Sequence, residues 1–403
     1  AFAQAAMTAP SQPDTCAEST VVPVIVGVAL GHFLNDLMQS LIPAAYPLLK
    51  ENLALSFTQI GLVTFVFQGT ASVLQPLVGL YTDRRPLPFA MAAGMASTGT
   101  GLVLLAHAAS FAMVLLSVAF IGLGSAIFHP EASRIARLAA GMRPGFAQSV
   151  FQVGGNAGSA LGPLAAAFIV LERGQVSIEW FAAVALAAML VLYAVGRWYR
   201  SAGATRAANR KARAAAAAPA PHVVRRGMAI LILLMVSKFV YSVSFSSYYT
   251  FYLIERFSLT KAQANLCLFI FLAAVAAGTI IGGPVGDRIG RRRVILWSIL
   301  GILPLTLALP WLPLYANVVV AALAGLMLAS AFPAMVVYAQ DLMPRHTGMV
   351  AGLLFGLAFG IAAFGAALLG VLADQWGIVA VYKICAVLPA LGLAAFFLPD
   401  ARH

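Results

Sequence analysis

Long apolar stretches, separated by short clusters of Gly, Pro and charged residues, run through almost the whole chain. Most of them reach the roughly 20 residues that an α-helix needs to cross a bilayer. Polar and apolar positions do not alternate over segments of about ten residues, as they would in a transmembrane β-strand. The pattern therefore predicts twelve transmembrane helices. The predicted helices span residues 22–48, 57–81, 87–108, 111–138, 146–171, 178–199, 228–254, 262–286, 294–314, 317–341, 347–372 and 377–398.

The composition agrees with a chain that lies almost wholly in lipid. Of the 403 residues, 62% are hydrophobic and only 9% are charged, whereas about 25% of the residues of an ordinary soluble domain are charged. This difference excludes a soluble globular protein. The predicted spans use more than half of the chain, which leaves room for short loops but for no large domain outside the lipid bilayer.

A basic, alanine-rich stretch divides the predicted helices into two groups of six. Residues 200–227 contain several arginines and no acidic residue, and we interpret them as a cytoplasmic linker. The predicted domains are a cytoplasmic N-terminal tail (1–21), an N-terminal six-helix half (22–199), the basic linker (200–227) and a C-terminal six-helix half (228–403).

The distribution of Lys and Arg predicts the orientation of the chain. Nineteen of the 25 Lys and Arg residues lie in the linker, in loops that follow even-numbered helices or near the C-terminus. Because cytoplasmic loops of membrane proteins carry an excess of Lys and Arg, both termini are predicted to lie in the cytoplasm. This bias accounts for most of the net charge of +12, and we expect no nucleic-acid partner.

The sequence lacks the usual patterns of a metal centre or an enzyme. Cys16, Cys267 and Cys385 lie far apart, which is typical neither of a disulfide framework nor of a metal site. The six histidines are dispersed, and no H-E-x-x-H, paired-Asp or Ser/His/Asp spacing stands out. We therefore expect no metal site and no catalytic residues, and a membrane-embedded enzyme is the least favoured alternative.

The two predicted halves repeat one another. The segment Leu259 to Leu266 lies 204 residues after the similar segment Leu55 to Leu62, and Gly283-x-x-x-Asp287-Arg288 lies 204 residues after Gly79-x-x-x-Asp83-Arg84. A duplicated six-helix unit is typical of secondary transporters, in which two halves rock about a site near the middle of the membrane.

At these loop segments the chain resembles the major facilitator superfamily, which implies the major facilitator fold of twelve helices in two halves. In the physical interpretation of the motif, Gly lets two helix ends approach closely, while Asp lies near a helix N-terminus or a basic side chain and closes the cytoplasmic side. An incidental Asp in a basic turn is the alternative. The predicted gating residues are Gly79, Asp83, Arg84, Arg134, Arg137, Gly283, Asp287, Arg288, Arg291 and Asp341.

A closer resemblance, from about His32 to Pro399, is to the fosmidomycin resistance protein family of bacterial efflux pumps. It rests on long strings such as HFLNDLMQSLIPAAYPLLKE, FHPEASRIARLA, AQSVFQVGGNAGSALGPL and SSYYTFYLIERF. The resemblance implies a multi-pass protein of the bacterial inner (cytoplasmic) membrane that exports a small anionic phosphonate drug in exchange for protons. We expect a monomer with no cofactor besides the proton gradient. A proton-coupled importer of a small organic anion is the alternative.

The predicted fifth helix carries a run of small residues from Gly154 to Pro163. This run is similar to the Gly-Pro motif of proton antiporters in the superfamily, although Ala165 and Ala166 stand where two further glycines are usual. Small residues spaced by four also permit close helix packing and Pro permits a bend, so packing alone is a second interpretation.

Polar residues of the predicted first and fourth helices are candidates for proton coupling. His32, Asn35, Asp36 and Gln39 share one face of a helix. Asp36 lies near the middle of its span, where a carboxylate is costly unless it is paired or hydrated. We predict proton coupling by Asp36, His32, His129 and Glu131. A structural role for Asp36, and a cytoplasmic ion-pair network for Glu131 with Arg134, are the alternatives.

Lys238 is the plainest partner for an anionic substrate, because it is a basic residue inside a predicted span. It could instead extend toward the cytoplasmic surface. Amide and phenol side chains of other spans could line the path, although the tyrosines could also anchor the helices at the membrane interface. The predicted substrate-binding residues are Lys238, Asn35, Gln39, Gln68, Gln75, Gln152, Asn156, Tyr241 and Tyr249.

Overall fold

The computed structural model describes residues 19–55, 57–203, 205, 220–259 and 261–399. Within these residues the regular structure is helical and contains no strand, which confirms the predicted all-α fold. Most of the predicted tail and most of the predicted linker lie outside the described residues.

The N-terminal half contains six long helices. They are α1 (Val22–Asn52), α2 (Phe57–Arg84), α3 (Ala90–Ala106), α4 (Phe111–Ala139), α5 (Pro144–Ala165) and α7 (Phe181–Trp198). A π-helical turn (Ala166–Val170), the short α6 (Leu171–Arg173) and a 3₁₀ helix (Gln175–Trp180) connect α5 to α7, and a second π-helical turn (Tyr199–Gly203) follows α7.

The C-terminal half repeats this arrangement. Its helices are α9 (Pro221–Phe257), α10 (Lys261–Ile289), α11 (Arg291–Ala308), α12 (Leu314–Leu342), α13 (Thr347–Trp376) and α14 (Ile378–Cys385). A short 3₁₀ turn (Leu309–Trp311) follows α11, and a 3₁₀ helix (Leu388–Phe397) continues α14.

Nine helical segments of the described chain are long and apolar enough to cross a membrane, by length and composition. The apolar α3 is shorter, with 17 residues. The described parts of α2 and α5 are not among these nine segments. The twelve long helices therefore agree with the predicted number of spans, although not every one is equally apolar.

Local sequence explains where several helices start and stop. The Ser110 side chain accepts a hydrogen bond from the backbone N–H of Met113 at 3.3 Å and caps the start of α4. Gly290, with φ of +96°, forms the turn between α10 and α11, and Gly377, with φ of +78°, joins α13 to α14. Both angles favour glycine. The predicted last helix changes from α to 3₁₀ geometry just before Pro389, which lacks a backbone N–H.

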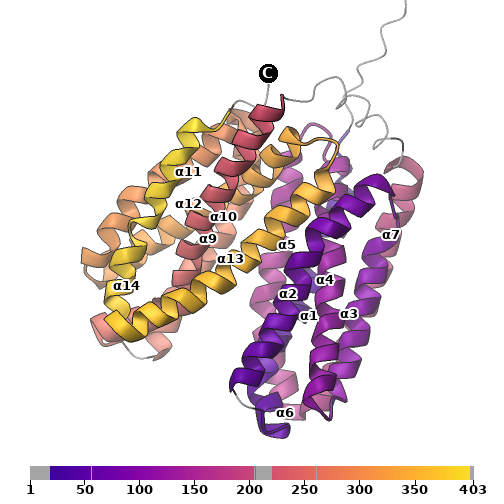
Figure 1. Ribbon diagram of the computed structural model, residues 1–403, viewed down its shortest axis with the longest axis horizontal. Helices are drawn as coiled ribbons and strands as arrows, with labels where there is room; N and C mark the ends of the chain where they lie inside the picture. Colours follow the sequence, from indigo (N-terminus) through magenta and orange to yellow (C-terminus); the bar gives the residue numbers. More distant parts are fainter. Residues whose placement is uncertain (1–18, 56, 204, 206–219, 260, 400–403) are drawn as a thin grey trace, which may run out of the picture.

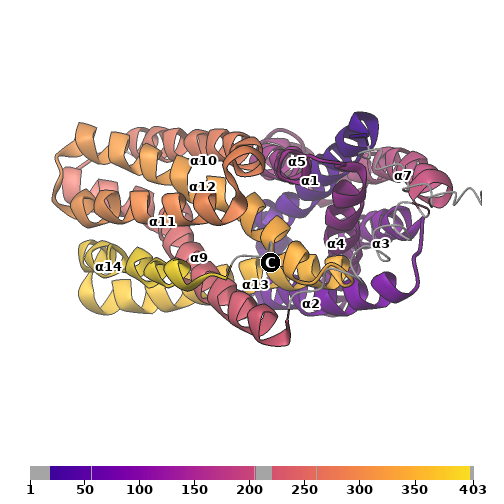
Figure 2. The ribbon, with the colours of Figure 1, turned by 90° about the horizontal axis from the view of Figure 1, so that it is seen from above.

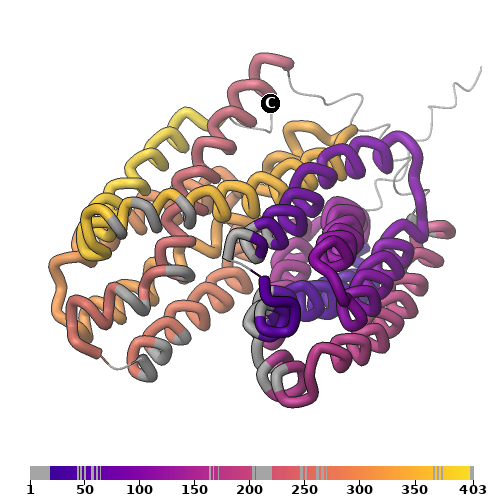
Figure 3. The backbone as a smooth tube through the Cα atoms, turned by 60° about the horizontal axis from the view of Figure 1, so that its bottom comes forward, coloured from indigo at the N-terminus to yellow at the C-terminus, as the bar shows by residue number. Residues whose placement is uncertain are grey.

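The two halves lie side by side and meet most closely at one end (Figure 1). We call this end the basic end; there α2 meets α3, α4 meets α5, α10 meets α11, and α12 meets α13. Toward the opposite end the two groups of helices diverge (Figures 1 and 3). Across the boundary, α2 packs against α13 and α5 packs against α10 (Figure 2). These four helices therefore frame the space between the halves.

Candidate functional site

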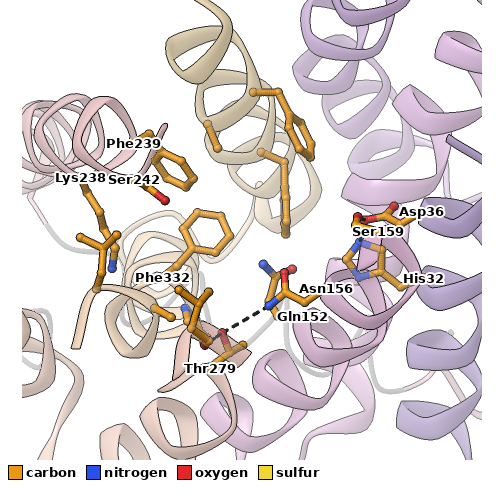
Figure 4. A pocket seen from close by; sticks show the side chains of 17 residues that line it. His32, Asp36, Gln152, Asn156, Ser159, Lys238, Phe239, Ser242, Thr279 and Phe332 are labelled. Atoms are coloured by element: carbon orange, nitrogen blue, oxygen red, sulfur yellow. Dashed lines mark hydrogen bonds and ion pairs between the residues drawn. The ribbon is translucent and has the colours of Figure 1, made fainter. Parts of the chain in front are cut away.

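A cavity of about 230 Å³ lies between the two halves and takes its walls from both (Figure 4). One wall comes from α1 and α5, and the opposite wall from α9, α10, α12 and α13. The lining residues are His32, Asp36, Gln152, Asn156, Ser159, Lys238, Phe239, Ser242, Val275, Thr279, Leu328, Ala329, Phe332, Pro333, Phe355, Ala358 and Phe359.

Asp36 forms the polar centre of the N-terminal wall. Its carboxylate lies 3.3 Å from Nε2 of His32, one helical turn earlier on α1. It also accepts hydrogen bonds from the side-chain amide of Asn35 at 2.9 Å and from the Ser159 hydroxyl of α5 at 3.3 Å. Asp36 is thus a carboxylate surrounded by hydrogen-bond donors at the edge of the cavity.

His129 of α4 completes this cluster from behind the cavity wall. Its Nε2 lies 3.6 Å from Asp36 Oδ1, and its side chain is 1% exposed. Its ring meets that of His32 edge-on, with centroids 5.1 Å apart. The structure therefore joins three of the four predicted proton-coupling residues, which we call the His-Asp-His cluster (His32, Asp36 and His129).

Backbone carbonyls set the tautomers of both imidazoles. His32 Nδ1 lies 2.7 Å from the carbonyl oxygen of Phe151, and His129 Nδ1 lies 3.0 Å from the carbonyl oxygen of Ser125. Because a carbonyl oxygen can only accept a hydrogen bond, we assign a proton to each Nδ1. Both Nε2 atoms are then directed at Asp36.

The small-residue run of α5 makes room for the cluster. A Cβ atom on Gly155 would lie 2.4 Å from His32 Nε2 and 2.9 Å from Asp36 Oδ2. On Gly154 and Gly158, a Cβ atom would lie 2.1 Å from the carbonyl oxygens of Ala29 and Phe33, respectively. The motif is therefore a surface for close packing of α5 on α1.

Lys238 of α9 lines the opposite wall (Figure 4). Its side chain is buried, and among the described residues its Nζ atom has no hydrogen-bond partner. The structure thus places Lys238 against the cavity, with no acidic residue of the described chain paired to its amino group.

The predicted amide residues divide into two groups. Gln152 and Asn156 line the cavity, and the Asn156 amide donates to the Thr279 hydroxyl of α10 across the boundary at 3.4 Å (Figure 4). The other predicted amide residues are not part of the cavity lining. The Asn35 side chain donates a hydrogen bond to Asp36, and the Gln75 side chain is fully buried in α2. Gln39 and Gln68 are half-buried on α1 and α2, respectively.

The predicted tyrosines also lie away from the cavity lining. The Tyr249 hydroxyl donates to Asn317 Oδ1 at 2.8 Å, inside the C-terminal half. Tyr241 is buried beside Lys238 and lines a separate small pocket with it. Neither residue lines the cavity between the halves, and their role in substrate binding stays a prediction.

Glu131 faces away from the cluster. Its carboxylate pairs with Arg134 on the next turn of α4, with Nε at 3.0 Å from Oε1. The same guanidinium donates to the Tyr199 hydroxyl at 2.9 Å and lies over that ring. Glu131 is completely buried, and this arrangement corresponds to the predicted ion-pair alternative and not to a relay with His129.

Two aspartates connect the halves at the basic end. Asp83 of α2 accepts hydrogen bonds from the backbone N–H groups of Gly348 and Met349, at 3.1 and 2.9 Å, in the first turn of α13. Asp287 of α10 accepts from the N–H groups of Gly145 and Phe146, both at 2.9 Å, in the first turn of α5. Each carboxylate therefore lies at the positive end of a helix in the other half.

Glycines permit both of these approaches. A Cβ atom on Gly79 would lie 2.3 Å from the Gly348 carbonyl oxygen, and one on Gly283 would lie 2.1 Å from the Gly145 carbonyl oxygen. The two copies of the motif thus make equivalent contacts with opposite halves.

A third contact at the basic end involves Asp341 of α12. It pairs with Arg137 of α4 and with Arg291 of α11, and Arg291 also lies 3.9 Å from Asp287 Oδ1. Arg84 and Arg288, two further predicted gating residues, are exposed.

Several residues of the site have no distinct sequence signal. Phe332, Phe355 and Phe359 form an aromatic part of the cavity wall, but in the sequence they are ordinary members of apolar helices. Tyr199 lies beyond the end of α7, far along the chain from Arg134. For Ser242 of α9 and Thr279 of α10, the only sequence signal for a place in the cavity wall is the hydroxyl group that each side chain carries.

The sequence profile of the Major Facilitator Superfamily matches this chain over residues 28–264 and again over residues 230–403. The fosmidomycin resistance protein of Escherichia coli (strain K12) is 52% identical over 380 residues, which cover 94% of this chain and 93% of that protein. An uncharacterised MFS-type transporter of Bacillus subtilis (strain 168), YfnC, is 42% identical over 385 residues, or 95% of this chain and 94% of that protein.

Among solved structures, the fold is similar to that of the transporter FucP in the outward conformation, with a TM-score of 0.73 and 14% identity over 94% of this chain and 99% of that chain. FucP is the fucose:proton symporter of E. coli. At this level of identity the likeness concerns the fold.

Proposed function

Because this chain belongs to the Major Facilitator Superfamily, whose members are transporters, we propose that it exports the phosphonate antibiotic fosmidomycin in exchange for protons. The superfamily and its twelve-helix fold were predicted from the sequence, and the family matches confirm both. They also confirm that the protein is a multi-pass membrane transporter and not an enzyme. Substrate, coupling ion and direction are the proposed part.

One observation carries the proposal: a proton acceptor and a cation lie on opposite walls of a single cavity between the halves. The acceptor is Asp36, supported by His32 and His129, and the cation is Lys238. Bringing a phosphonate anion to the middle of a bilayer is costly without a compensating charge. Lys238 supplies that charge, while Gln152 and Asn156 offer amide hydrogen bonds from the opposite wall.

In the proposed cycle, the His-Asp-His cluster releases a proton when substrate enters from the cytoplasm and takes one up after substrate leaves. Substrate and protons are thus the expected small-molecule partners, and the proton gradient is the energy source. The 52% identity to a fosmidomycin resistance protein supports the substrate. We place the protein in the bacterial inner membrane as a monomer, with both termini in the cytoplasm.

With this orientation, the basic end is cytoplasmic and the structure corresponds to an outward-facing state. Asp83, Asp287 and the Arg137–Asp341 pair then hold the cytoplasmic side closed. Alternating access requires these contacts to break when the halves rock. They form the proposed gate, together with Gly79, Gly283, Arg134 and Arg291.

Everted membrane vesicles with an acidic interior test the proposal. Fosmidomycin added outside should collapse part of the imposed pH gradient in vesicles that contain the protein, because entry of the drug releases protons. Vesicles that contain Lys238→Ala serve as the matched control and should keep the gradient. An unchanged gradient, with uptake of the drug only into right-side-out vesicles, would instead indicate the alternative importer.

A further inference from the structure

We propose that His32, Asp36 and His129 form a binding site for a divalent transition-metal ion of the Zn²⁺ class. The sequence predicts no metal site, because His129 is far from the other two residues along the chain. In the structure, His Nε2, carboxylate oxygen and His Nε2 all lie within 4.8 Å of one another. The proposal rests on this arrangement and does not require the proposed transport function.

The distances in the cluster resemble those between ligands of one tetrahedral ion. Zn²⁺ binds His nitrogen and carboxylate oxygen at roughly 2.0–2.2 Å, so neighbouring ligand atoms are about 3.3–3.5 Å apart. His32 Nε2 lies 3.3 Å from Asp36 Oδ2, and His129 Nε2 lies 3.6 Å from Asp36 Oδ1. The two contacts are made with different carboxylate oxygens, and the three ligand atoms lie within 4.8 Å of one another, so an ion bound by all three would draw these side chains closer together.

The imidazoles are also oriented as metal-binding histidines usually are. Such a histidine donates its other ring N–H to a carbonyl or carboxylate, which fixes its tautomer and orientation. His32 and His129 each place Nδ1 against a backbone carbonyl, of Phe151 and Ser125, respectively. Each Nε2 lone pair is therefore directed toward the carboxylate, and either a proton or a metal ion between these acceptors would relieve their repulsion.

His129 provides an independent sign of a missing partner. Its Nε2 atom is buried and has no hydrogen-bond partner among the described residues, and its side chain is 1% exposed. A buried polar atom without a partner is unfavourable in a protein. A bound ion would satisfy this atom and the Asp36 carboxylate together.

The donor set selects the class of ion. Two imidazole nitrogens and one carboxylate suit Zn²⁺, Co²⁺ or Ni²⁺, whereas Mg²⁺ and Ca²⁺ prefer oxygen ligands. His32 and Asp36 line the cavity (Figure 4), so the fourth coordination position faces the space between the halves. A water molecule or an anionic oxygen of a substrate can occupy it.

Purified protein without a histidine tag allows the site to be tested in detergent. Added Co²⁺ should produce the strong visible absorption of tetrahedral Co²⁺ at one ion per chain, and Zn²⁺ should displace it. His129→Gln and Asp36→Asn should each weaken Zn²⁺ binding by at least about 100-fold, since loss of an outer-shell partner alone costs roughly 10–100-fold. His107→Ala is the matched control, because His107 is an exposed histidine paired with Glu179.

Binding that is equal in wild type, His129→Gln and Asp36→Asn would overturn the proposal, as would a preference for Mg²⁺ over Zn²⁺. Thermal unfolding of each variant shows whether it is folded. If both variants lose Zn²⁺ binding, local damage at one position does not explain the loss. Because the measurement uses no vesicles and no drug, its failure would leave the proposed export untouched, and failure of export would leave this site standing.

Discussion

Gly155 of α5 lies against the His32 ring of α1 so closely that a Cβ atom would be 2.4 Å from Nε2. The absence of a side chain at this position therefore allows the imidazole to reach Asp36. The small-residue run, predicted to serve either antiport or packing, packs α5 closely against α1 and thereby positions the cluster.

Gly155→Ala should disrupt the His-Asp-His cluster. The added methyl group must displace His32 or separate α1 from α5, and such overpacking costs about 1–3 kcal/mol. We expect a lower unfolding temperature and loss of drug export. Gly69→Ala on α2 is the control, because a Cβ atom there meets nothing within 4 Å. Equal unfolding temperatures and equal drug export in the two variants would show that Gly155 has no special role.

Asp36→Asn should separate coupling from transport. The amide keeps the shape of the carboxylate but cannot take up a proton, so drug accumulation driven by a pH gradient should fall to background. Exchange of labelled for unlabelled drug across the membrane should persist, because it needs no net proton movement. Gradient-driven accumulation by Asp36→Asn would exclude Asp36 as the proton carrier.

Lys238→Ala should weaken binding of the phosphonate. Loss of a charge-assisted hydrogen bond costs about 1.5–3 kcal/mol, which corresponds to roughly a 10- to 100-fold lower affinity. Lys238→Arg keeps the charge and should retain part of the affinity. Equilibrium binding to purified protein measures both, and an unchanged affinity in Lys238→Ala would remove Lys238 from the substrate site.

Asp83→Asn and Asp287→Asn should each loosen the closed basic end. Asn keeps one acceptor oxygen but loses the negative charge at the helix N-terminus, an interaction worth roughly 0.3–2 kcal/mol. Hydrogen exchange should therefore increase in the first turn of α13 for Asp83→Asn and of α5 for Asp287→Asn. Arg84→Gln, which changes an exposed side chain, is the control.

The two aspartates should also be coupled, since each connects the same pair of halves. If they act together, the effects of Asp83→Asn and Asp287→Asn on turnover will not add in the double variant. Strict additivity would mean that the two contacts open independently.

Tyr199→Phe should destabilise the N-terminal half. The change removes the hydroxyl that accepts a hydrogen bond from Arg134 at 2.9 Å, and an unsatisfied buried donor costs about 1–3 kcal/mol. The ring, and its contact with the guanidinium, remain. Tyr193→Phe on α7 is the control because Tyr193 is exposed. An unchanged unfolding temperature would show that water replaces the hydroxyl.

The sequence alone determined the features that depend on local periodicity and composition. The length of apolar stretches predicts the helices, and the repeat at 204 residues predicts two similar halves. His32 and Asp36 lie one turn apart, so any helix brings them to the same face. The loop motifs likewise predicted that Asp83 and Asp287 lie near a helix N-terminus or a basic side chain, and in the structure each accepts hydrogen bonds at a helix N-terminus.

Tertiary structure decided which faces meet. The rotation of α4 against α1 brings His129 to Asp36, whereas Glu131, two residues further along α4, pairs with Arg134 of the same helix. The position of α9 turns Lys238 toward the cavity, while Tyr249 lies within the C-terminal half. Such choices depend on packing between segments far apart in the chain, and periodicity within one helix contains no information about its rotation relative to another.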